Sequence, residues 1–548
     1  MRIAVLANVT VDLLAGLLKP AFDVYIPEGY DTWQQEALSG DSALYRCRPD
    51  AVVINLHAGA CGSAWQTPAA GRELLDGWKR AFNALSANLP DIPLFISSLD
   101  IGGAACAYGA ERQYQAYFEN SLIESIRQIP RAYVLPVREL AADMGRRAFY
   151  APKMWYLGAM PYSLKALQAL ADLIRRYVSS LQMRNKKCLA VDLDNTLWGG
   201  VIGEDGLDGI ILGDHLQGAI YKDTQRLIKK IREQGVILAV LSRNNPEDAR
   251  AAFTHPDMVL REDDFAAKYI DWNDKTDNIR KLARELNIGL DSIVFLDDNP
   301  AEREHMKAAC PEAAVPDFPD DPSKLPQTVA QIYNSYFFTL EVTDEDRHKT
   351  EMYRARAKTQ AERNGSVTAE DYLKKLQMTI AVHPIREDEI IRVTQLANKT
   401  NQFNVTGRRY TENEIRALAA NASSEIITMR IADKYGDLGL IAAVILKYGA
   451  GCAHIEQFFM SCRAMGRRAE NELMAYLKRH LAGKDTDRIR AEYVRTAKNA
   501  PVSDLFDRLG FSVTEVTAEE GGSAAVQKKY AAGADALPDS TGLYKYTD

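Results

Sequence analysis

The chain of 548 residues is too long for one hydrophobic core, and its length predicts roughly three to four domains. Hydrophobic residues make up 47% and charged residues 26%, which is typical of an ordinary soluble protein. The net charge of −7 excludes a global basic field of the kind that binds nucleic acid or an anionic membrane. We therefore expect neither as a partner, although a local basic pocket for a phosphate stays open.

The cysteines and the N-terminal residues bear on the compartment. Seven cysteines are scattered along the chain without a C-x-x-C pair, which favours reduced thiols over a disulfide framework or a structural zinc site. The first residues lack the longer apolar core and the cleavage site of a signal peptide, and no apolar run approaches the length of a membrane span. The sequence predicts a cytoplasmic protein.

Residues 1–184 form the first predicted domain, in which short apolar strands alternate with helical segments. This alternation predicts an α/β fold whose mostly parallel sheet carries helices on both faces. We expect helices at residues 71–89 and 114–129, and strands at residues 2–7, 24–27, 51–56, 94–98 and 132–136.

The turn after the first strand bears on the chemistry of this domain. It reads Ala7-Asn-Val-Thr10, where an SGNH hydrolase, an esterase with a Ser-Asp-His triad, carries Gly-Asp-Ser. Residues 150–163 likewise contain neither the Asp nor the His of that triad. The domain thus resembles the hydrolase's flavodoxin-like fold without its chemistry, which favours a docking or scaffold role. Asn8, His57 and Asp100 follow strand ends, and we interpret each as a satisfied loop residue rather than as a cleft residue.

The second predicted domain, residues 185–325, begins with the stretch LAVDLDNTLW. A buried strand at residues 188–193 leads into two carboxylates, Asp192 and Asp194. Carboxylates at the carboxyl end of a parallel strand lie where open α/β sheets bind ligands. They suit Mg²⁺ binding, or a division of work between nucleophile and general acid. The alternative for this short motif alone is an Asp-rich turn that caps a helix.

A second strand of this domain also ends on polar residues. After a helix at residues 217–234, an apolar strand at 236–241 opens onto Ser242-Arg243-Asn244. A hydroxyl and polar backbone at the carboxyl end of a strand are suited to phosphate oxygens, as is the start of the helix that follows near Pro246.

A lysine and a third strand complete the pattern. Lys275 precedes a helix that runs to about residue 286, and a strand at 292–296 ends on Asp297 and Asp298. The intervals between these motifs leave no room for a separate cap domain. An uncapped site would admit a phosphate presented by something as large as a protein.

In order along the chain, Asp192-Leu-Asp-Asn-Thr196, Ser242, Lys275 and Asp297-Asp298 resemble the four motifs of the haloacid dehalogenase (HAD) phosphatase superfamily. The resemblance implies that Asp192 attacks phosphorus to form an aspartyl-phosphate, and that Asp194 protonates the leaving group and then activates water. A carboxylate that attacks a phosphate dianion meets like-charge repulsion, so a cation and a metal ion are needed.

The same resemblance assigns the binding residues. Mg²⁺ would lie on Asp192, on the backbone carbonyl of Asp194, and on Asp297 or Asp298. The phosphoryl oxygens would lie against the residues that surround these carboxylates, which are Thr196, Ser242, Arg243, Asn244 and Lys275.

Residues 326–377 read as a highly charged helical connector, and residues 378–548 as a further α/β domain. A helix is expected at 387–398 and a second one to about residue 480. Strands are expected at residues 378–383, 425–432, 438–448, 454–460 and 489–493.

A turn in this third domain, Ser461-Cys-Arg-Ala-Met-Gly466, resembles the pyrophosphate-binding turn of GNAT-type acyltransferases. Backbone N–H groups at the helix start hold the coenzyme A phosphates in that family. Arg463 and Gly466 match the pattern, but Arg468 stands at its last small position and would crowd a diphosphate. The departure favours a pantetheine arm or a phosphorylated acyl donor over free coenzyme A.

The combined stretches resemble the FkbH-like proteins, HAD subfamily IIIC, on DLDNTLWGGV, FLDDNPAER, KTNQFN and MSCRAMG. This resemblance implies that a glyceryl unit is loaded from 1,3-bisphosphoglycerate onto an acyl carrier protein in polyketide-type or related biosynthesis. Cys462, beside Arg463, is then either a thiol that accepts the acyl group or a small packed residue. The acyl or pantetheine group is expected on Lys399, Asn401, Asn404, Arg463, Gly466, Lys498 and Asn499.

Two other functions stay open at this point. One is a stand-alone phosphatase that acts on a phosphorylated sugar or metabolite in surface-polysaccharide biosynthesis. The other is an assembly scaffold whose first domain binds a partner, which the intact set of four motifs disfavours as the sole role.

Overall fold

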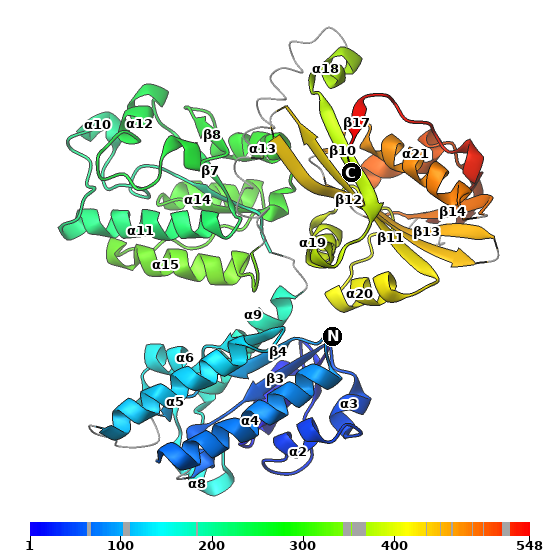
Figure 1. The fold of residues 1–548 in the computed structure, drawn as a ribbon. Coiled ribbons are helices and arrows are strands. Elements are labelled where there is room, and N and C mark those ends of the chain that lie inside the picture. The colour runs from blue at the N-terminus through cyan, green and yellow to red at the C-terminus, as the bar shows by residue number, and fades with distance from the viewer. Residues whose placement is uncertain are drawn as a thin grey trace. The chain divides into compact units, whose positions relative to one another are not determined.

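The computed structural model shows a multi-domain α/β fold, and its described residues form three sheets (Figure 1). Contacts divide the chain into two compact units, Met1–Gln182 and Met183–Asp548. No helix within the described parts of the chain is long and apolar enough to cross a membrane. The structure describes residues 1–62, 67–101, 110–181, 185–342, 352, 369–434, 436–449, 451–461, 464–484, 486–496, 498–517 and 527–547.

The first unit contains a parallel five-stranded sheet in the order β2-β1-β3-β4-β5. The strand residues of β1, β3 and β4 are almost all buried, because helices cover both faces of the sheet. The predicted strands are confirmed to within two residues at either end. The strands are β1 (Arg2–Ala7), β2 (Asp23–Tyr25), β3 (Ala51–Asn55), β4 (Leu94–Ser97) and β5 (Ala132–Leu135).

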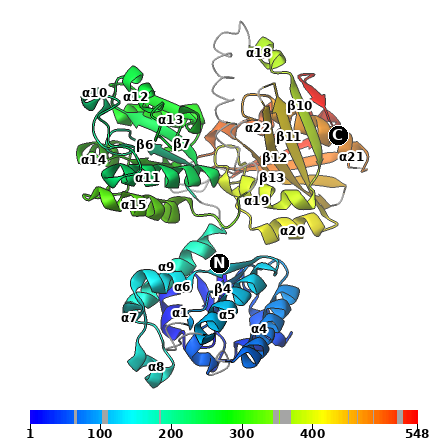
Figure 2. The ribbon, with the colours of Figure 1, turned by 60° about the vertical axis from the view of Figure 1, so that its left-hand side comes forward.

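Helices α4 and α5 pack together on one face of this sheet, and α1 packs against α9 on the other (Figures 1 and 2). Trp33, Trp78, Phe82 and Phe118 form an aromatic centre beneath α4 and α5. The helices are α1 (Asp12–Leu18), α2 (Trp33–Leu38), α3 (Ala43–Cys47), α4 (Pro68–Asn88), α5 (Ala110–Arg127), α6 (Val137–Met144), α7 (Arg146–Phe149), α8 (Pro152–Gly158) and α9 (Leu164–Ser180), with a 3₁₀ turn η1 (Ala58–Cys61).

The second unit begins with a parallel four-stranded sheet in the order β8-β7-β6-β9. Successive residues of β6 face opposite sides, so Leu189 and Val191 join one hydrophobic cluster while Cys188 and Ala190 join another. The strands are β6 (Cys188–Val191), β7 (Ile237–Ser242), β8 (Ala267–Ile270) and β9 (Ile293–Leu296). The helices are α10 (Ile202–Asp205), α11 (Leu216–Glu233), α12 (Pro246–Ala252), α13 (Lys275–Leu286), α14 (Pro300–Ala309) and α15 (Leu325–Ile332), with 3₁₀ turns η3 (Glu262–Asp264), η4 (Leu290–Ser292) and η5 (Pro322–Lys324).

Helix α15 corrects the predicted start of the connector. Leu325, Val329 and Ile332 are buried in the same cluster as β6, and a π-helical turn η6 (Tyr333–Phe337) adds Phe337 to it. The amphipathic face of α15 packs against α11, so this segment belongs to the core of the second sheet. The charged stretch predicted as a connector lies largely outside the described residues.

The third sheet has eight strands in the order β15-β16-β14-β13-β12-β11-β10-β17 and is mostly antiparallel. Parallel pairing joins β13 to β14 and β10 to β17. The strands are β10 (Met378–Pro384), β11 (Ser424–Asp433), β12 (Gly436–Gly449), β13 (Cys452–Met460), β14 (Arg488–Val494), β15 (Ser512–Thr517), β16 (Gln527–Gly533) and β17 (Tyr544–Tyr546). The helices are α18 (Ala369–Lys375), α19 (Ile390–Lys399), α20 (Glu412–Ala420), α21 (Ala469–Ala482) and α22 (Leu505–Arg508), with 3₁₀ turns η7 (Glu387–Glu389), η9 (Ala500–Val502) and η10 (Ala534–Ala536).

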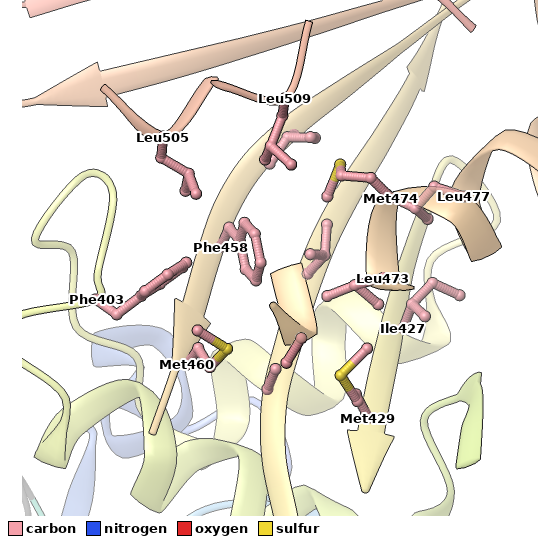
Figure 3. Packing of buried hydrophobic residues seen from close by; sticks show 14 of the residues in the cluster. Phe403, Ile427, Met429, Phe458, Met460, Leu473, Met474, Leu477, Leu505 and Leu509 are labelled. Atoms are coloured by element: carbon pink, nitrogen blue, oxygen red, sulfur yellow. The ribbon is translucent and has the colours of Figure 1, made fainter. Parts of the chain in front are cut away.

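Neighbouring residues of β11 and β13 point to opposite faces of this sheet. Ile426 and Phe459 pack under α19 and α20, whereas Ile427 and Phe458 pack under α21. Figure 3 shows the second of these clusters, where Met429, Met460 and the leucines of α21 and α22 fill the space beside Phe458. The sheet is therefore buried on both faces around its centre.

Candidate active site

The carboxyl ends of three neighbouring strands bring the predicted motifs together. Strand β6 lies between β7 and β9, and the register pairs Val191 with Val240 and with Leu296. Asp192 and Asp297 are the next residues after Val191 and Leu296, so their carboxylates leave the sheet side by side. Ser242 ends β7 on the same edge.

Lys275 connects the two strand ends. It is the first residue of α13, whose preceding residue Asp274 accepts a hydrogen bond from Thr276 N at 2.7 Å and so caps the helix. Lys275 Nζ donates to Asp297 Oδ2 at 2.6 Å and lies 3.1 Å from Asp192 Oδ1. Burial lowers the pKa of Lys275, but the charges of Asp192 and Asp297 outweigh it and the pKa is raised. The lysine is therefore held as a cation against both carboxylates.

Asp192 is the best-placed nucleophile of this cluster. The residue is 6% exposed, and its buried Oδ1 lies 3.1 Å from Lys275 Nζ. Burial raises the pKa of Asp192 above its usual range, while Lys275 opposes that rise. A buried carboxylate oxygen next to a cation is suited to attack on phosphorus.

Asp194 turns away from the strand into a short loop. Asn195 adopts φ of 51°, in the left-handed region, and thereby redirects the chain after Asp194. Asp194 Oδ1 accepts from Trp198 Nε1 at 2.9 Å and from Ile202 N at 3.0 Å, and Oδ2 accepts from Asn244 Nδ2 at 2.8 Å. These donors fix the carboxylate, and its role in proton transfer stays a prediction. The contribution of Trp198, fully buried, was missed from the sequence.

The other predicted phosphate ligands divide into two groups. Thr196 is fully buried and its hydroxyl has no hydrogen-bond partner among the described residues, while Asn244 connects Ser242 Oγ with Asp194. Arg243 instead reaches Glu302 on α14, with NH1 2.6 Å from Oε1. The guanidinium therefore braces the loop after β7 against α14, and its contact with phosphate stays a prediction.

The site fits a divalent metal ion. One oxygen each of Asp192, Asp297 and Asp298 lie within 4.8 Å of one another, and carboxylate oxygens are the ligands that Mg²⁺ prefers. Burial, with the charge of Asp192 beside it, raises the pKa of Asp298 to about 6. Asp297 already accepts from Lys275 through Oδ2 and from Asn299 N through Oδ1, at 2.9 Å. Both oxygens of Asp297 are therefore engaged by donors of the protein, and we expect Asp298 to make the direct contact.

Added Mg²⁺ is expected to stabilise the second unit against unfolding. At about a hundredfold excess over its dissociation constant, the gain is roughly 2–3 kcal/mol, because the ion neutralises carboxylates that repel one another only in the folded chain. Urea unfolding with and without MgCl₂ measures this gain. Asp298→Asn should lose most of it, whereas Asp223→Asn, at an exposed position of α11, should retain it. An equal gain in all three proteins would contradict the assignment.

The predicted acyl-binding turn is only partly described. Cys462 and Arg463 lie outside the described residues. Gly466 has φ of 78°, a conformation that favours glycine, and is exposed. Arg467, which follows it, is buried and pairs with Asp433 at 2.6 Å.

Residues 403–405 occupy an unexpected position in the third sheet. The pairing of β13 with β14 ends at Ile455 and Ala491. Beyond that point Val405 N donates to Phe458 O at 3.2 Å, and Val494 N donates to Val405 O at 2.9 Å. The segment therefore lies between the two strands where they part. The ring of Phe403 packs against that of Phe458, with the ring centroids 4.9 Å apart (Figure 3).

Asn404 and Asn499 hold this inserted segment in place. Asn499 is fully buried, and its Nδ2 donates to Asn404 O and to Val494 O, both at 2.9 Å. Asn404 Oδ1 accepts from Gly407 N at 2.8 Å. The side chains of both asparagines thus stabilise this loop, and their role in ligand binding stays a prediction.

Asn499→Ala is expected to lower the free energy of unfolding by about 2–4 kcal/mol. The change removes the amide that donates to the carbonyls of Asn404 and Val494, and it removes the Oδ1 acceptor of the Tyr493 hydroxyl at 3.1 Å. Urea unfolding measures the loss, with Asn421→Ala, at an exposed position after α20, as the matched control. Equal stabilities of the two variants would show that the asparagine is dispensable.

The remaining predicted ligands lie at polar positions of the second unit. Lys399 and Asn401 line a pocket together with Lys187 and Arg392. Lys187 Nζ donates to the carbonyl of Lys399 at 2.7 Å, and Asn401 Oδ1 accepts from Arg409. Lys498, by contrast, pairs with Asp291. A role in acyl binding stays a prediction for all three.

The chain is similar to solved structures of two kinds. The N-terminal part of the protein BF1531 from Bacteroides fragilis, which contains a phosphatase domain complexed with Mg, is 27% identical, with 62% of this chain and 94% of that chain covered and a TM-score of 0.57. The ribosomal-protein-S18-alanine N-acetyltransferase of Escherichia coli is 10% identical over 30% of this chain and all of that chain (100%), with a TM-score of 0.24. A Desulfovibrio desulfuricans protein assigned to the GNAT acetyltransferase family is 12% identical, with 28% of this chain and 99% of that chain covered. Its TM-score is also 0.24. No family model and no curated protein sequence matches the chain.

The parallel sheet and the site that it carries are thus similar to those of an enzyme with a phosphatase domain. The sheet presents Asp192, Ser242 and Asp297 on one edge, with Lys275 across them. The donor set of that edge fits a divalent metal ion.

Proposed function

We propose that the protein releases phosphate from 1,3-bisphosphoglycerate and loads the glyceryl unit onto an acyl carrier protein, as the resemblance to FkbH-like proteins implies. The observation that carries the phosphoryl half is the cluster in which Lys275 Nζ lies 2.6 Å from Asp297 and 3.1 Å from Asp192. Carbonyl and phosphoryl chemistry then balance in two steps. The carrier thiol gives up its proton and attacks C1, and phosphate leaves as the thioester forms. Water then accepts the phosphoryl group from the C3 oxygen as a second phosphate, and the C3 oxygen keeps a proton.

The second step uses the residues of the HAD-type site. An oxygen of Asp192 forms a bond to phosphorus while the bond from phosphorus to the C3 oxygen breaks. Asp194, held by Trp198 and Asn244, would give the leaving oxygen its proton and then take one from the attacking water. Lys275 offsets the negative charge that gathers on the phosphoryl oxygens. Mg²⁺, when bound to Asp192 and Asp298, would supply further positive charge there.

The open edge of the sheet supports a substrate that is carried by a protein. Between β6 and β7 the chain forms α10 and α11, and between β7 and β8 it forms α12 and the turn η3. These elements belong to the α/β layers, so the edge carries no inserted cap domain in the described residues. Trp272, three residues before Lys275, is 74% exposed on the same edge and offers an apolar contact for such a partner.

Intact-protein mass spectrometry tests the proposal. The enzyme is incubated with Mg²⁺ and 1,3-bisphosphoglycerate, with and without a pantetheinylated carrier protein, as wild type, Asp192→Asn and Cys462→Ala. We expect a glyceryl adduct on the carrier in wild type. In Asp192→Asn this adduct should be lost and replaced by one that keeps the C3 phosphate, because Asp192 acts on that phosphate. An adduct on the enzyme that Cys462→Ala abolishes would identify that thiol as an intermediate acceptor. Phosphate release without any adduct would contradict loading from this donor and favour a stand-alone phosphatase.

A further inference from the structure

The edge of the first unit where a hydrolase would carry its triad is closed by its own side chains. Asn8 follows β1, and its Oδ1 accepts from His57 N at 2.8 Å while its Nδ2 donates to His57 O at 3.1 Å. This pair of bonds ties the loop after β1 to the loop after β3. The crevice between those two strands, the usual ligand site of such a sheet, is thereby bridged.

Aromatic rings complete the closure. The centroid of the His57 ring lies 5.1 Å from the ring centroid of Trp155, 5.5 Å from that of Tyr150 and 6.0 Å from that of Tyr162. Burial lowers the pKa of His57 to about 4, so the ring is neutral at pH 7. Its Nδ1 already accepts a hydrogen bond from Gly59 N. Asp100 pairs with Arg146 at 2.7 Å and accepts from Tyr150 at 2.9 Å. The interpretation of Asn8, His57 and Asp100 as satisfied loop residues agrees with these contacts.

Open space in this unit lies instead at the carboxyl ends of β1 and β2. A cavity of about 460 Å³ is present there, within the range of pockets that bind small molecules. Its apolar lining comes from β1, from the loop after it, and from the loop after β2, namely Val5, Ala7, Val9, Val11, Ile26 and Pro27. The polar groups around it are Thr10, Asp12, Glu28, Tyr30 and Thr32.

The loop after β2 holds a defined conformation around this cavity. Gly29 and Asp31 have φ of 89° and 55°, and Thr32 Oγ1 donates to the carbonyl of Glu28 at 3.1 Å. A Cβ at Gly29 would approach Thr32 Cγ2 to 3.2 Å, so the turn suits glycine on two counts. On the other side Thr10 Oγ1 donates to Gly158 O at 2.8 Å. The walls of the cavity are therefore fixed before any ligand binds.

The charge of the lining restricts what the cavity can hold. Asp12 and Glu28 carry carboxylates, and the side chains of both lack a hydrogen bond or ion pair with any residue that the structure describes. The lining contains no lysine, arginine or histidine. Tyr30, 55% exposed, adds an aromatic ring at the rim.

We propose that this cavity binds a small organic cation with an aliphatic body, of the class of protonated alkylamines. The carboxylates of Asp12 and Glu28 would pair with the ammonium group, and the ring of Tyr30 would add a cation–π contact. The valines, Ile26 and Pro27 would cover the methylene groups. Phosphates and carboxylates are excluded because they would meet two negative charges and no positive one.

Isothermal titration calorimetry on the full chain tests this assignment with n-pentylamine, which is protonated at neutral pH, and with pentanoate as a probe of equal length and opposite charge. We expect pentylammonium to bind and pentanoate not to bind. Glu28→Gln and Asp12→Asn should each lower the affinity for pentylammonium by about tenfold, because each removes one charge-assisted contact. Glu73→Gln, at an exposed position of α4, should leave binding unchanged.

Three results would overturn the proposal: no binding of pentylammonium, equal binding of pentanoate, or equal affinities of Glu28→Gln, Asp12→Asn and wild type. Circular dichroism and thermal unfolding of each variant are measured in parallel. A wild-type spectrum and the wild-type transitions show that a loss of amine binding does not come from a misfolded first unit.

Discussion

Asp192→Asn is expected to abolish release of the phosphate from the C3 oxygen in the absence of a carrier protein, with turnover reduced by about 10⁴-fold or more. The asparagine amide has almost the shape of the carboxylate, but it carries no charge and is a far weaker nucleophile. Lys275 keeps its 2.6 Å contact with Asp297, so the site should stay assembled. Colorimetric phosphate release from 1,3-bisphosphoglycerate or p-nitrophenyl phosphate measures the loss.

A surface variant separates this effect from a general charge effect. Asp223→Asn removes one carboxylate from an exposed position of α11 and should leave turnover within about twofold of wild type. If Asp192→Asn retained a tenth or more of the wild-type rate, the carboxylate could not be the group that attacks phosphorus. Thermal unfolding of both variants, monitored by circular dichroism, checks that each is folded.

Lys275→Met has the second-largest expected effect and acts on both activity and stability. Turnover should fall by about 10²–10³-fold, because the cation nearest the transferring phosphoryl group is lost. Stability without metal should fall by roughly 3–5 kcal/mol, because the buried carboxylates of Asp192 and Asp297 then face each other without a cation. Excess Mg²⁺ should restore part of the stability and little of the activity.

Lys281→Met is the matched control, since this lysine lies at an exposed position of the same helix. Its activity and urea midpoint should stay near wild type. Full activity of Lys275→Met in the presence of Mg²⁺ would show that the metal alone supplies the positive charge, and would remove the lysine from the mechanism.

The sheets and most of the phosphatase site follow from local patterns in the sequence. The runs that became β6, β7 and β9 are short, apolar and followed at once by Asp192, Ser242 and Asp297. Because parallel strands end on one edge, strand type and polar ending together predict that these residues meet. Lys275 was predicted at a helix start and is the first residue of α13.

What could not be predicted depends on contacts between distant segments. The ion pair of Arg243 is one such contact, because its partner Glu302 lies about sixty residues further on, on α14. The insertion of residues 403–405 between β13 and β14 rests on backbone bonds to Phe458 and Val494, which no local pattern of the loop reveals. The end of the second core was placed too early because α15 follows a proline-rich stretch that resembles a linker.

Site mapping of the phosphoryl group tests the central claim most directly. Wild-type enzyme is mixed with Mg²⁺ and 1,3-bisphosphoglycerate, quenched rapidly in acid, digested and analysed by tandem mass spectrometry. The account predicts a phosphoryl group on Asp192 that is absent from Asp192→Asn. Continued phosphate release by Asp192→Asn, or a phosphoryl group on another residue in wild type, would contradict it.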